Sequence, residues 1–277
     1  MTKWLRENLW RHITGWIMCA FAVFPLYLVL LSAFNVAAQD FKPTNEDYDI
    51  SESMIKASVT RTNFYIKDSF FATSINSEEF LKVADKSKPT VIYLHGCNYD
   101  YPPYERSLLK FYLGLGFNFA VTDFIKRGDA KPACIAVNGV LVVRTNLRAR
   151  IPARVLELNA HIDWLKANGF KTIYVVGFSE GGMVIQRMQK VVDAAVIHAM
   201  TCIPLAPNAR RPTNENKYLQ LISTRDPFLD TQGAIPCEGR PGYETFISAV
   251  GNAPSHDPFS DPSWEGRIKE FLGLKNQ

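Results

Sequence analysis

The feature that most constrains the fold is a short segment that reads Val-Val-Gly-Phe-Ser-Glu-Gly-Gly-Met over residues 175–183. The β-branched residues before Gly177 favour a strand, and the residues from Gly181 onward favour a helix. The chain must therefore turn from strand to helix around Ser179. In so sharp a turn, the positions two before and two after the serine have no room for a side chain, which accounts for glycine at both.

Strand-like and helix-like segments alternate along the rest of the chain. This alternation predicts the α/β class, with a mainly parallel central sheet flanked by helices on both faces. We expect one such domain over residues 59–277, without an internal repeat. The expected strands are 59–66, 70–75, 90–94, 118–122, 172–176, 194–198, 218–223 and 243–250, and the expected helices are 104–115, 181–191, 261–274 and one that begins at Pro152.

A Gly-x-Ser-x-Gly turn between a strand and a helix is a nucleophile elbow, which exposes a serine hydroxyl for attack on a carbonyl carbon. The hydroxyl of Ser179 needs an imidazole to accept its proton, and that imidazole needs a carboxylate to orient it. On this kind of fold the order along the chain is serine, acid, histidine. Of the two histidines after Ser179, His198 ends a predicted strand, whereas His256 lies in a loop between the last strand and the last helix. We therefore predict His256 as the catalytic base.

The acid must follow the carboxyl end of a strand, so that it lies at the same edge of the sheet as Ser179. Asp226 directly follows the predicted strand 218–223, whereas Asp193 precedes a strand and falls at the opposite edge. Asp226 is therefore the predicted acid, and Asp230 is the alternative.

The oxyanion formed by attack on a carbonyl needs two backbone N–H donors. One should come from Glu180, the residue after the nucleophile, and the other from the loop after the strand 90–94. That loop begins His95-Gly96-Cys97, and we assign the second donor to Cys97. His95 is expected to be a buried, hydrogen-bonded residue that organises the loop.

Four cysteines lie beyond the N-terminal segment, at positions 97, 134, 202 and 237. An even number is consistent with two disulfides in an oxidising compartment, and three pairings are compatible with the sequence. Four buried free thiols are the alternative, since cysteine is often a small core residue. The cysteines and histidines lack zinc-like spacing, so we expect no metal.

Together, His95-Gly96, the elbow at 177–181, Asp226 and His256 resemble the α/β-hydrolase superfamily over nearly the whole chain after residue 58. Asp226 lies 47 residues after Ser179, and His256 lies 30 residues after Asp226, which leaves room for little or no lid. This compactness resembles the dienelactone hydrolase family. Its founding members use a cysteine nucleophile where this chain has serine, so their lactone substrate is not carried over.

Exported members of that family often have a cysteine after the His-Gly pair, another after an Arg-Gly segment, and a third shortly past the acid. Cys97, Cys134 and Cys237 stand at these places. The resemblance therefore implies disulfides Cys97–Cys134 and Cys202–Cys237, each tying a loop at the active-site edge.

The N-terminal segment differs in composition from the rest. Residues 1–38 carry three basic side chains and one acidic one, which is +2 of the formal net charge of +4, and residues 13–34 are uncharged and strongly apolar. With the ending Val-Ala-Ala, this pattern predicts a signal peptide cleaved after Ala38, and the alternative is an uncleaved membrane anchor. Residues 39–58 form a polar, flexible lead-in. The protein is expected to be exported, periplasmic or secreted.

Charge and motifs elsewhere exclude several classes of function. Beyond residue 38 the chain is close to neutral, and it has neither a glycine-rich phosphate loop nor a basic-aromatic pattern for nucleic acid. Four arginines at 144, 148, 150 and 154 are expected to form a solvated face, or to approach the pocket and favour an acidic substrate.

We therefore expect a serine hydrolase that cleaves a small ester, thioester or lactone without a cofactor. Two alternatives remain open at this point. One is a peptidase or acyltransferase with the same triad, and the other is a non-catalytic binding protein on a hydrolase fold.

Overall fold

The computed structural model describes residues 63–67, 72–97, 102–122, 134–137, 140–143, 147–202, 215–224, 226, 236–248, 256 and 261–274. The predicted signal peptide at 1–38 and the lead-in at 39–58 lie outside these residues and stay predictions. No helix in the described part of the chain is both long and apolar enough to cross a membrane.

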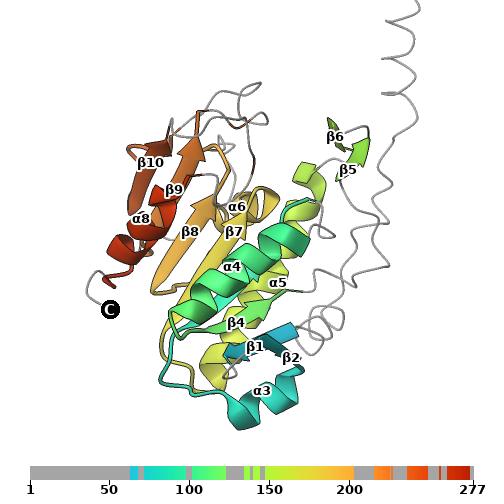
Figure 1. Ribbon diagram of the computed structural model, residues 1–277, viewed down its shortest axis with the longest axis vertical. Helices are drawn as coiled ribbons and strands as arrows, with labels where there is room; N and C mark the ends of the chain where they lie inside the picture. Colours follow the sequence, from blue (N-terminus) through green and yellow to red (C-terminus); the bar gives the residue numbers. More distant parts are fainter. Residues whose placement is uncertain are drawn as a thin grey trace, which may run out of the picture. The chain divides into compact units, whose positions relative to one another are not determined.

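The centre of the structure is an eight-stranded sheet in the order β10-β9-β8-β7-β3-β4-β1-β2 (Figure 1). The six strands from β10 to β4 are parallel, and β1 runs antiparallel to both of its neighbours. A separate hairpin pairs β5 with β6. The strands are β1 Asn63–Lys67, β2 Ala72–Ile75, β3 Thr90–Leu94, β4 Asn118–Val121, β5 Cys134–Val137, β6 Val140–Val143, β7 Ile173–Phe178, β8 Ala194–His198, β9 Tyr218–Ser223 and β10 Tyr243–Ser248.

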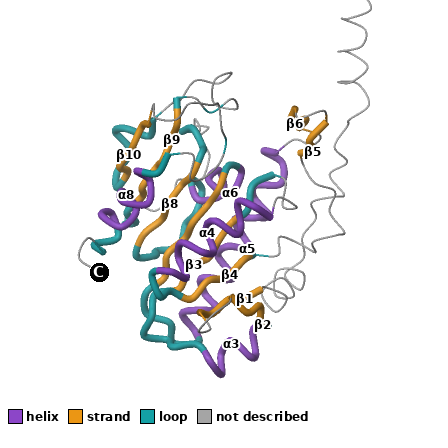
Figure 2. The backbone as a smooth tube through the Cα atoms, in the orientation of Figure 1, coloured by secondary structure: helices purple, strands orange, loops and turns teal. Residues whose placement is uncertain are grey.

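Helices cover both faces of this sheet. The described helices are α3 Ser77–Val83, α4 Pro102–Gly114, α5 Leu147–Ala167, α6 Glu180–Ile185 and α8 Ser263–Phe271. Figure 2 shows α4 crossing the strands on one side, with α5 behind it. A mostly parallel sheet flanked by helices, with a tight turn from β7 into α6, fits the α/β-hydrolase fold and confirms the predicted fold class. The expectation of little or no lid falls partly on residues 203–214 and 227–235, which lie outside the described residues.

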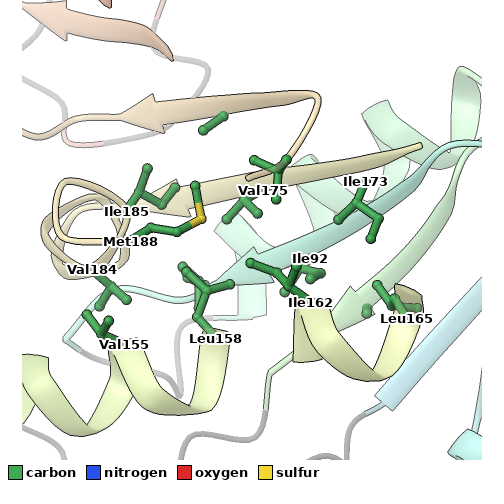
Figure 3. Close-up of a cluster of buried hydrophobic side chains, with 14 of the residues drawn as sticks. Ile92, Val155, Leu158, Ile162, Leu165, Ile173, Val175, Val184, Ile185 and Met188 are labelled. Atoms are coloured by element: carbon green, nitrogen blue, oxygen red, sulfur yellow. The ribbon is translucent and has the colours of Figure 1, made fainter. Parts of the chain in front are cut away.

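Side chains along each strand point alternately to the two faces of the sheet, so the core consists of two hydrophobic clusters, one on each face. In β3, Ile92 and Leu94 pack with α5 and α6, whereas Val91 and Tyr93 pack with α4 and α8 on the other face. Figure 3 shows the first cluster, in which side chains of α5 point toward β3 and β7. Because residues in a strand point alternately to opposite faces, an all-apolar run is needed to satisfy both layers. All five residues of β3 are buried accordingly.

The helices α5 and α6 differ most from the sequence prediction. α5 begins at Leu147, so Pro152 lies inside the helix instead of starting it. α6 ends at Ile185, well before the predicted end at Val191. Its last turn tightens, since the N–H groups of Arg187 and Met188 bond to carbonyls three residues back.

The sequence prediction also omitted one helix and one hairpin. Helix α3 is short, and Asn76 caps it by accepting a hydrogen bond from the backbone N–H of Glu79 at 2.9 Å. From this helix Phe80 stacks on Phe64 at 4.2 Å and on Phe170 at 5.2 Å between ring centroids. The helix therefore depends on packing more than on a long helical pattern. The hairpin of β5 and β6 is too short to show a clear period.

Cys202 and Cys237 form a disulfide, the pairing that the family resemblance implies. Gln220, inside β9, accepts from the backbone N–H of Cys237 at 2.8 Å and donates to the carbonyl of Met200 at 2.9 Å. The bridge thus lies against β9 itself as well as beside the end of β8. Cys97 is also disulfide-bonded. Because the side chain of Cys134 lies outside the described side chains, the Cys97–Cys134 pairing stays a prediction.

Stability should depend on pH through a buried histidine of α5. His161 is 1% exposed, and burial lowers its pKa from 6.5 to about 4, although its Nδ1–H donates to the carbonyl of Glu157 at 2.8 Å. Between these values the unfolded chain binds a proton that the folded protein does not. The free energy of unfolding should therefore fall by on the order of 3 kcal/mol as pH drops from about 6.5 to 4.

Urea unfolding at a series of pH values measures this loss. His161→Gln removes the titration and should flatten the same part of the curve. Curves of equal slope for the two proteins between pH 4 and 6.5 would contradict the assignment.

Removing the disulfide should destabilise the protein. Cys202 and Cys237 are separated by 35 residues, and releasing a loop of this size should lower the free energy of unfolding by about 4 kcal/mol. Urea unfolding of the double variant Cys202→Ala/Cys237→Ala, compared with the oxidised protein, tests this. An unchanged transition midpoint would show that the bridge contributes nothing.

Candidate active site

The predicted site residues follow the carboxyl ends of parallel strands. Ser179 follows β7, Cys97 follows β3, Asp226 follows β9 and His256 follows β10. Because β3, β7, β9 and β10 run in the same direction, these ends lie at one edge of the sheet. Asp230, the alternative acid, lies outside the described residues.

Ser179 occupies a backbone conformation that is rare for a residue with a side chain. Its φ is 52° and its ψ is −115°. Its N–H donates to the carbonyl of His198 at 2.9 Å, and its carbonyl accepts from the N–H of Gly182 at 2.9 Å. The turn is thus held from β8 on one side and by the first turn of α6 on the other. A strained, over-determined conformation of this kind is typical of functional sites.

Three glycines make this turn sterically feasible. A Cβ at Gly177 would lie 2.5 Å from the backbone carbon of Gly181, and a Cβ at Gly181 would lie 2.1 Å from the carbonyl oxygen of Leu94. The requirement for glycine at both positions therefore agrees with the sequence argument. Gly182 is needed as well, because a Cβ there would lie 2.7 Å from Ile197 of β8.

Asp226 and His256 form a close pair. The Nδ1 atom of His256 lies 2.6 Å from Oδ2 of Asp226. The carboxylate is buried, and 11% of the histidine side chain is exposed. The imidazole also packs on Phe178, at 5.0 Å between ring centroids, so it lies beside the residue that precedes Ser179. A carboxylate on Nδ1 selects the tautomer with a proton there, which leaves Nε2 as the basic nitrogen.

The segment that carries His256 is closed at its base. Ser248, the last residue of β10, donates its hydroxyl proton to the carboxylate of Asp261, just before α8. Asp261 also accepts from the N–H of Ser263 at 2.8 Å. Burial raises the pKa of Asp261, but the hydrogen bonds from Ser248 and Ser263 outweigh it and lower the pKa overall. The two ends of the His256 segment are therefore joined by a charge-assisted hydrogen bond.

The loop after β3 lies directly against the elbow. A Cβ at Gly96 would lie 3.1 Å from the ring of Phe178 and 3.4 Å from Cβ of Ser179. Cys97 is buried at 6% exposure. His95 is buried at 3% exposure with its Nδ1 atom 2.6 Å from the carbonyl oxygen of Gly96, as a loop organiser should be.

A buried ion pair lies beneath these two segments. Nη1 of Arg154 is 3.1 Å from Oε1 of Glu180, and neither side chain is exposed. Nη2 of Arg154 donates to the carbonyl of His95 at 2.8 Å. For Arg154 the prediction of a solvated face is therefore wrong. Arg144 lies outside the described residues, as do the side chains of Arg148 and Arg150.

The pairing of the Arg154 and Glu180 side chains was not predicted from the sequence, which indicated a role only for the backbone N–H of Glu180. A signal for it was present in α5. Arg154 lies three residues after Ile151 and four before Leu158, both of which are buried. On a helix this spacing places all three on one face. An arginine inside an apolar stripe requires a buried anionic or carbonyl partner.

The arrangement provides the parts for acyl transfer. Ser179, the Asp226–His256 pair and the segments that carry Cys97 and Glu180 all lie at one edge of the sheet. In the described parts of the chain, no three His, Cys, Asp or Glu side chains are grouped so as to hold a metal ion.

Neither a protein-family model nor a curated protein sequence matches this chain. Solved structures with a similar course of the chain include an esterase of Pyrococcus furiosus, with 21% identity and a TM-score of 0.45 over 68% of this chain and 83% of that one. A lid-free α/β serine hydrolase of Xanthomonas campestris is 14% identical, with a TM-score of 0.45 over 76% and 87%. A candidate dienelactone hydrolase of Klebsiella pneumoniae is 15% identical, with a TM-score of 0.46 over 69% and 89%. The α/β-hydrolase fold itself is supported by the mostly parallel sheet, the helices on both faces and the elbow.

Proposed function

We propose that the protein is an exported serine hydrolase that cleaves a carboxylic ester, thioester or lactone through an acyl-enzyme on Ser179. The observation that carries the proposal is the Asp226–His256 pair, which packs on Phe178 beside a serine held in the strained elbow conformation. The fold itself does not require an Asp–His pair beside that serine. The pair supplies the oriented general base that a serine hydroxyl needs in order to act as a nucleophile.

In the first half-reaction, Oγ of Ser179 attacks the carbonyl carbon while Nε2 of His256 accepts the hydroxyl proton. The tetrahedral intermediate collapses as the imidazolium returns the proton to the leaving alcohol, thiol or lactone oxygen. Water then attacks the acyl-enzyme, its proton passes to His256, and the acid is released with regeneration of Ser179. Asp226 orients the imidazole and stabilises its protonated form.

The negative charge on the former carbonyl oxygen needs donors at the elbow. We assign these to the backbone N–H groups of Glu180 and Cys97. Support comes from Gly96, where an added Cβ would lie 3.4 Å from Cβ of Ser179, so the loop after β3 passes close to the nucleophile. Preorganised donors of this kind contribute a factor of about 10² to 10³ each to the rate.

Export is part of the proposal. It is supported by the basic and apolar start of the sequence, which predicts a signal peptide, and by the Cys202–Cys237 disulfide. Disulfides persist in oxidising compartments, such as the bacterial periplasm or the extracellular space.

Ser179→Ala should abolish hydrolysis of p-nitrophenyl esters and labelling by a fluorophosphonate probe, because the proposed acyl-enzyme forms on the Ser179 hydroxyl. Ser87→Ala is the control, since Ser87 is an exposed serine that donates only to Asp85, at 2.6 Å. A panel of esters, aminoacyl amides and acyl acceptors distinguishes hydrolase from peptidase or acyltransferase. Full activity of Ser179→Ala, or labelling of another residue, would refute the proposal.

Asp226→Asn should lower kcat by up to about 10⁴-fold, because an amide favours the wrong imidazole tautomer. The matched control is Asp193→Asn. Asp193 accepts from the N–H of Ile173 at 2.7 Å, at the opposite end of β7, and its replacement should leave kcat unchanged. Equal kcat values for the two variants would exclude Asp226 as the catalytic acid.

A further inference from the structure

We propose that Arg154 is a positioning residue that holds the two oxyanion donors at a fixed separation, an inference that rests on the serine hydrolase function proposed above. One guanidinium contacts both chain segments that carry these donors. It donates to the carbonyl of His95, two residues before Cys97, and it pairs with the carboxylate of Glu180, the residue directly after Ser179.

Two opposing contacts define the gap between these segments. Even a single Cβ at Gly96 would lie only 3.1 Å from the ring of Phe178 and 3.4 Å from Cβ of Ser179, so the loop after β3 has little room to move closer to the elbow. Arg154 joins His95 to Glu180 through contacts of 2.8 Å and 3.1 Å, so the loop cannot move away. The separation of the amides of Cys97 and Glu180 is thereby limited in both directions.

Burial makes this link stiff. The side chains of Arg154 and Glu180 are both 0% exposed, so neither charged group is hydrated while the pair is intact. A charge left unpaired in the interior is strongly unfavourable. The planar guanidinium also presents its donors at fixed angles, which a lysine ammonium does not. Arginine is therefore the side chain that can satisfy a carbonyl and a carboxylate together.

Arg154 itself does not touch the reacting atoms. Its contribution would appear where donor placement matters most, in the transition state for attack on a carbonyl. Oxyanion donors act on the position of the developing charge, and a displacement of about 1 Å can reduce the rate by about 10²-fold.

The test compares an oxygen ester with its thionoester analogue, in which sulfur replaces the carbonyl oxygen. Sulfur is larger and accepts hydrogen bonds weakly, so a thionoester gains less from the oxyanion donors. Arg154→Met should lower kcat for the oxygen ester by about tenfold to a hundredfold, with a smaller change in KM. The ratio of oxygen ester to thionoester rates should fall with it. Arg154→Lys should fall between wild type and Arg154→Met.

His161→Gln is the matched control, because His161 is a fully buried polar residue on the same helix that bonds within α5. Its rate ratio should equal that of the wild type. If Arg154→Met does not fold, Arg154→Lys and Glu180→Gln carry the same measurement. A wild-type rate ratio in folded Arg154 variants, or a loss confined to KM, would overturn the inference.

Hydrogen exchange provides a readout that needs no turnover. Peptides covering residues 90–97 and 177–186 should exchange faster in Arg154→Met than in His161→Gln. Unchanged exchange in both peptides would also overturn the inference. An inactive wild-type protein with the expected exchange pattern would refute the hydrolase proposal alone.

Discussion

The approach of Gly181 to the carbonyl of Leu94 is the constraint on which the active-site edge depends. β3 and β7 pair in parallel up to Leu94 and Gly177, and α6 begins where both strands end. Since these strands are neighbours in the middle of the sheet, the loop after β3 and the elbow must emerge side by side. A side chain at residue 181 would force them apart.

The two faces of the sheet contribute different parts of the site. Phe178 belongs to the cluster with α4 and α8, and His256 packs on it. Arg154 comes from α5, whose apolar residues belong to the other cluster. The elbow around Ser179 is therefore contacted from both faces of the sheet. The Asp226–His256 pair packs on Phe178 on one face, and Arg154 pairs with Glu180 from the other.

The fold was largely predictable because its strongest signals are local. The strands at 90–94, 194–198 and 218–223 have the predicted bounds, since buried parallel strands are apolar throughout and end at turn residues. The elbow was predictable because sterics alone require its glycines. Asp226 and His256 were chosen by their order along the chain, and the structure places their side chains in contact.

What the sequence could not provide depends on tertiary contacts. Arg154 was assigned to solvent because clustered arginines are usually exposed, yet its partners are more than twenty residues away along the chain. Helix α6 ends at Ile185, although the sequence predicts a helix that continues to Val191. α5 starts at Leu147, five residues before Pro152. A proline near the start of a helical pattern therefore indicates a helix but does not determine its first residue.

The hydrogen bond between Ser248 and Asp261 has an evolutionary consequence. It closes the segment that carries the histidine independently of that segment's own sequence, because Ser248 ends β10 and Asp261 lies just before α8. The entropy of closing a loop grows only slowly with its length, by about 0.6 kcal/mol per doubling. Insertions there can therefore reshape the surroundings of the histidine without disturbing the sheet, so substrate preference can diverge among descendants while the scaffold stays constant.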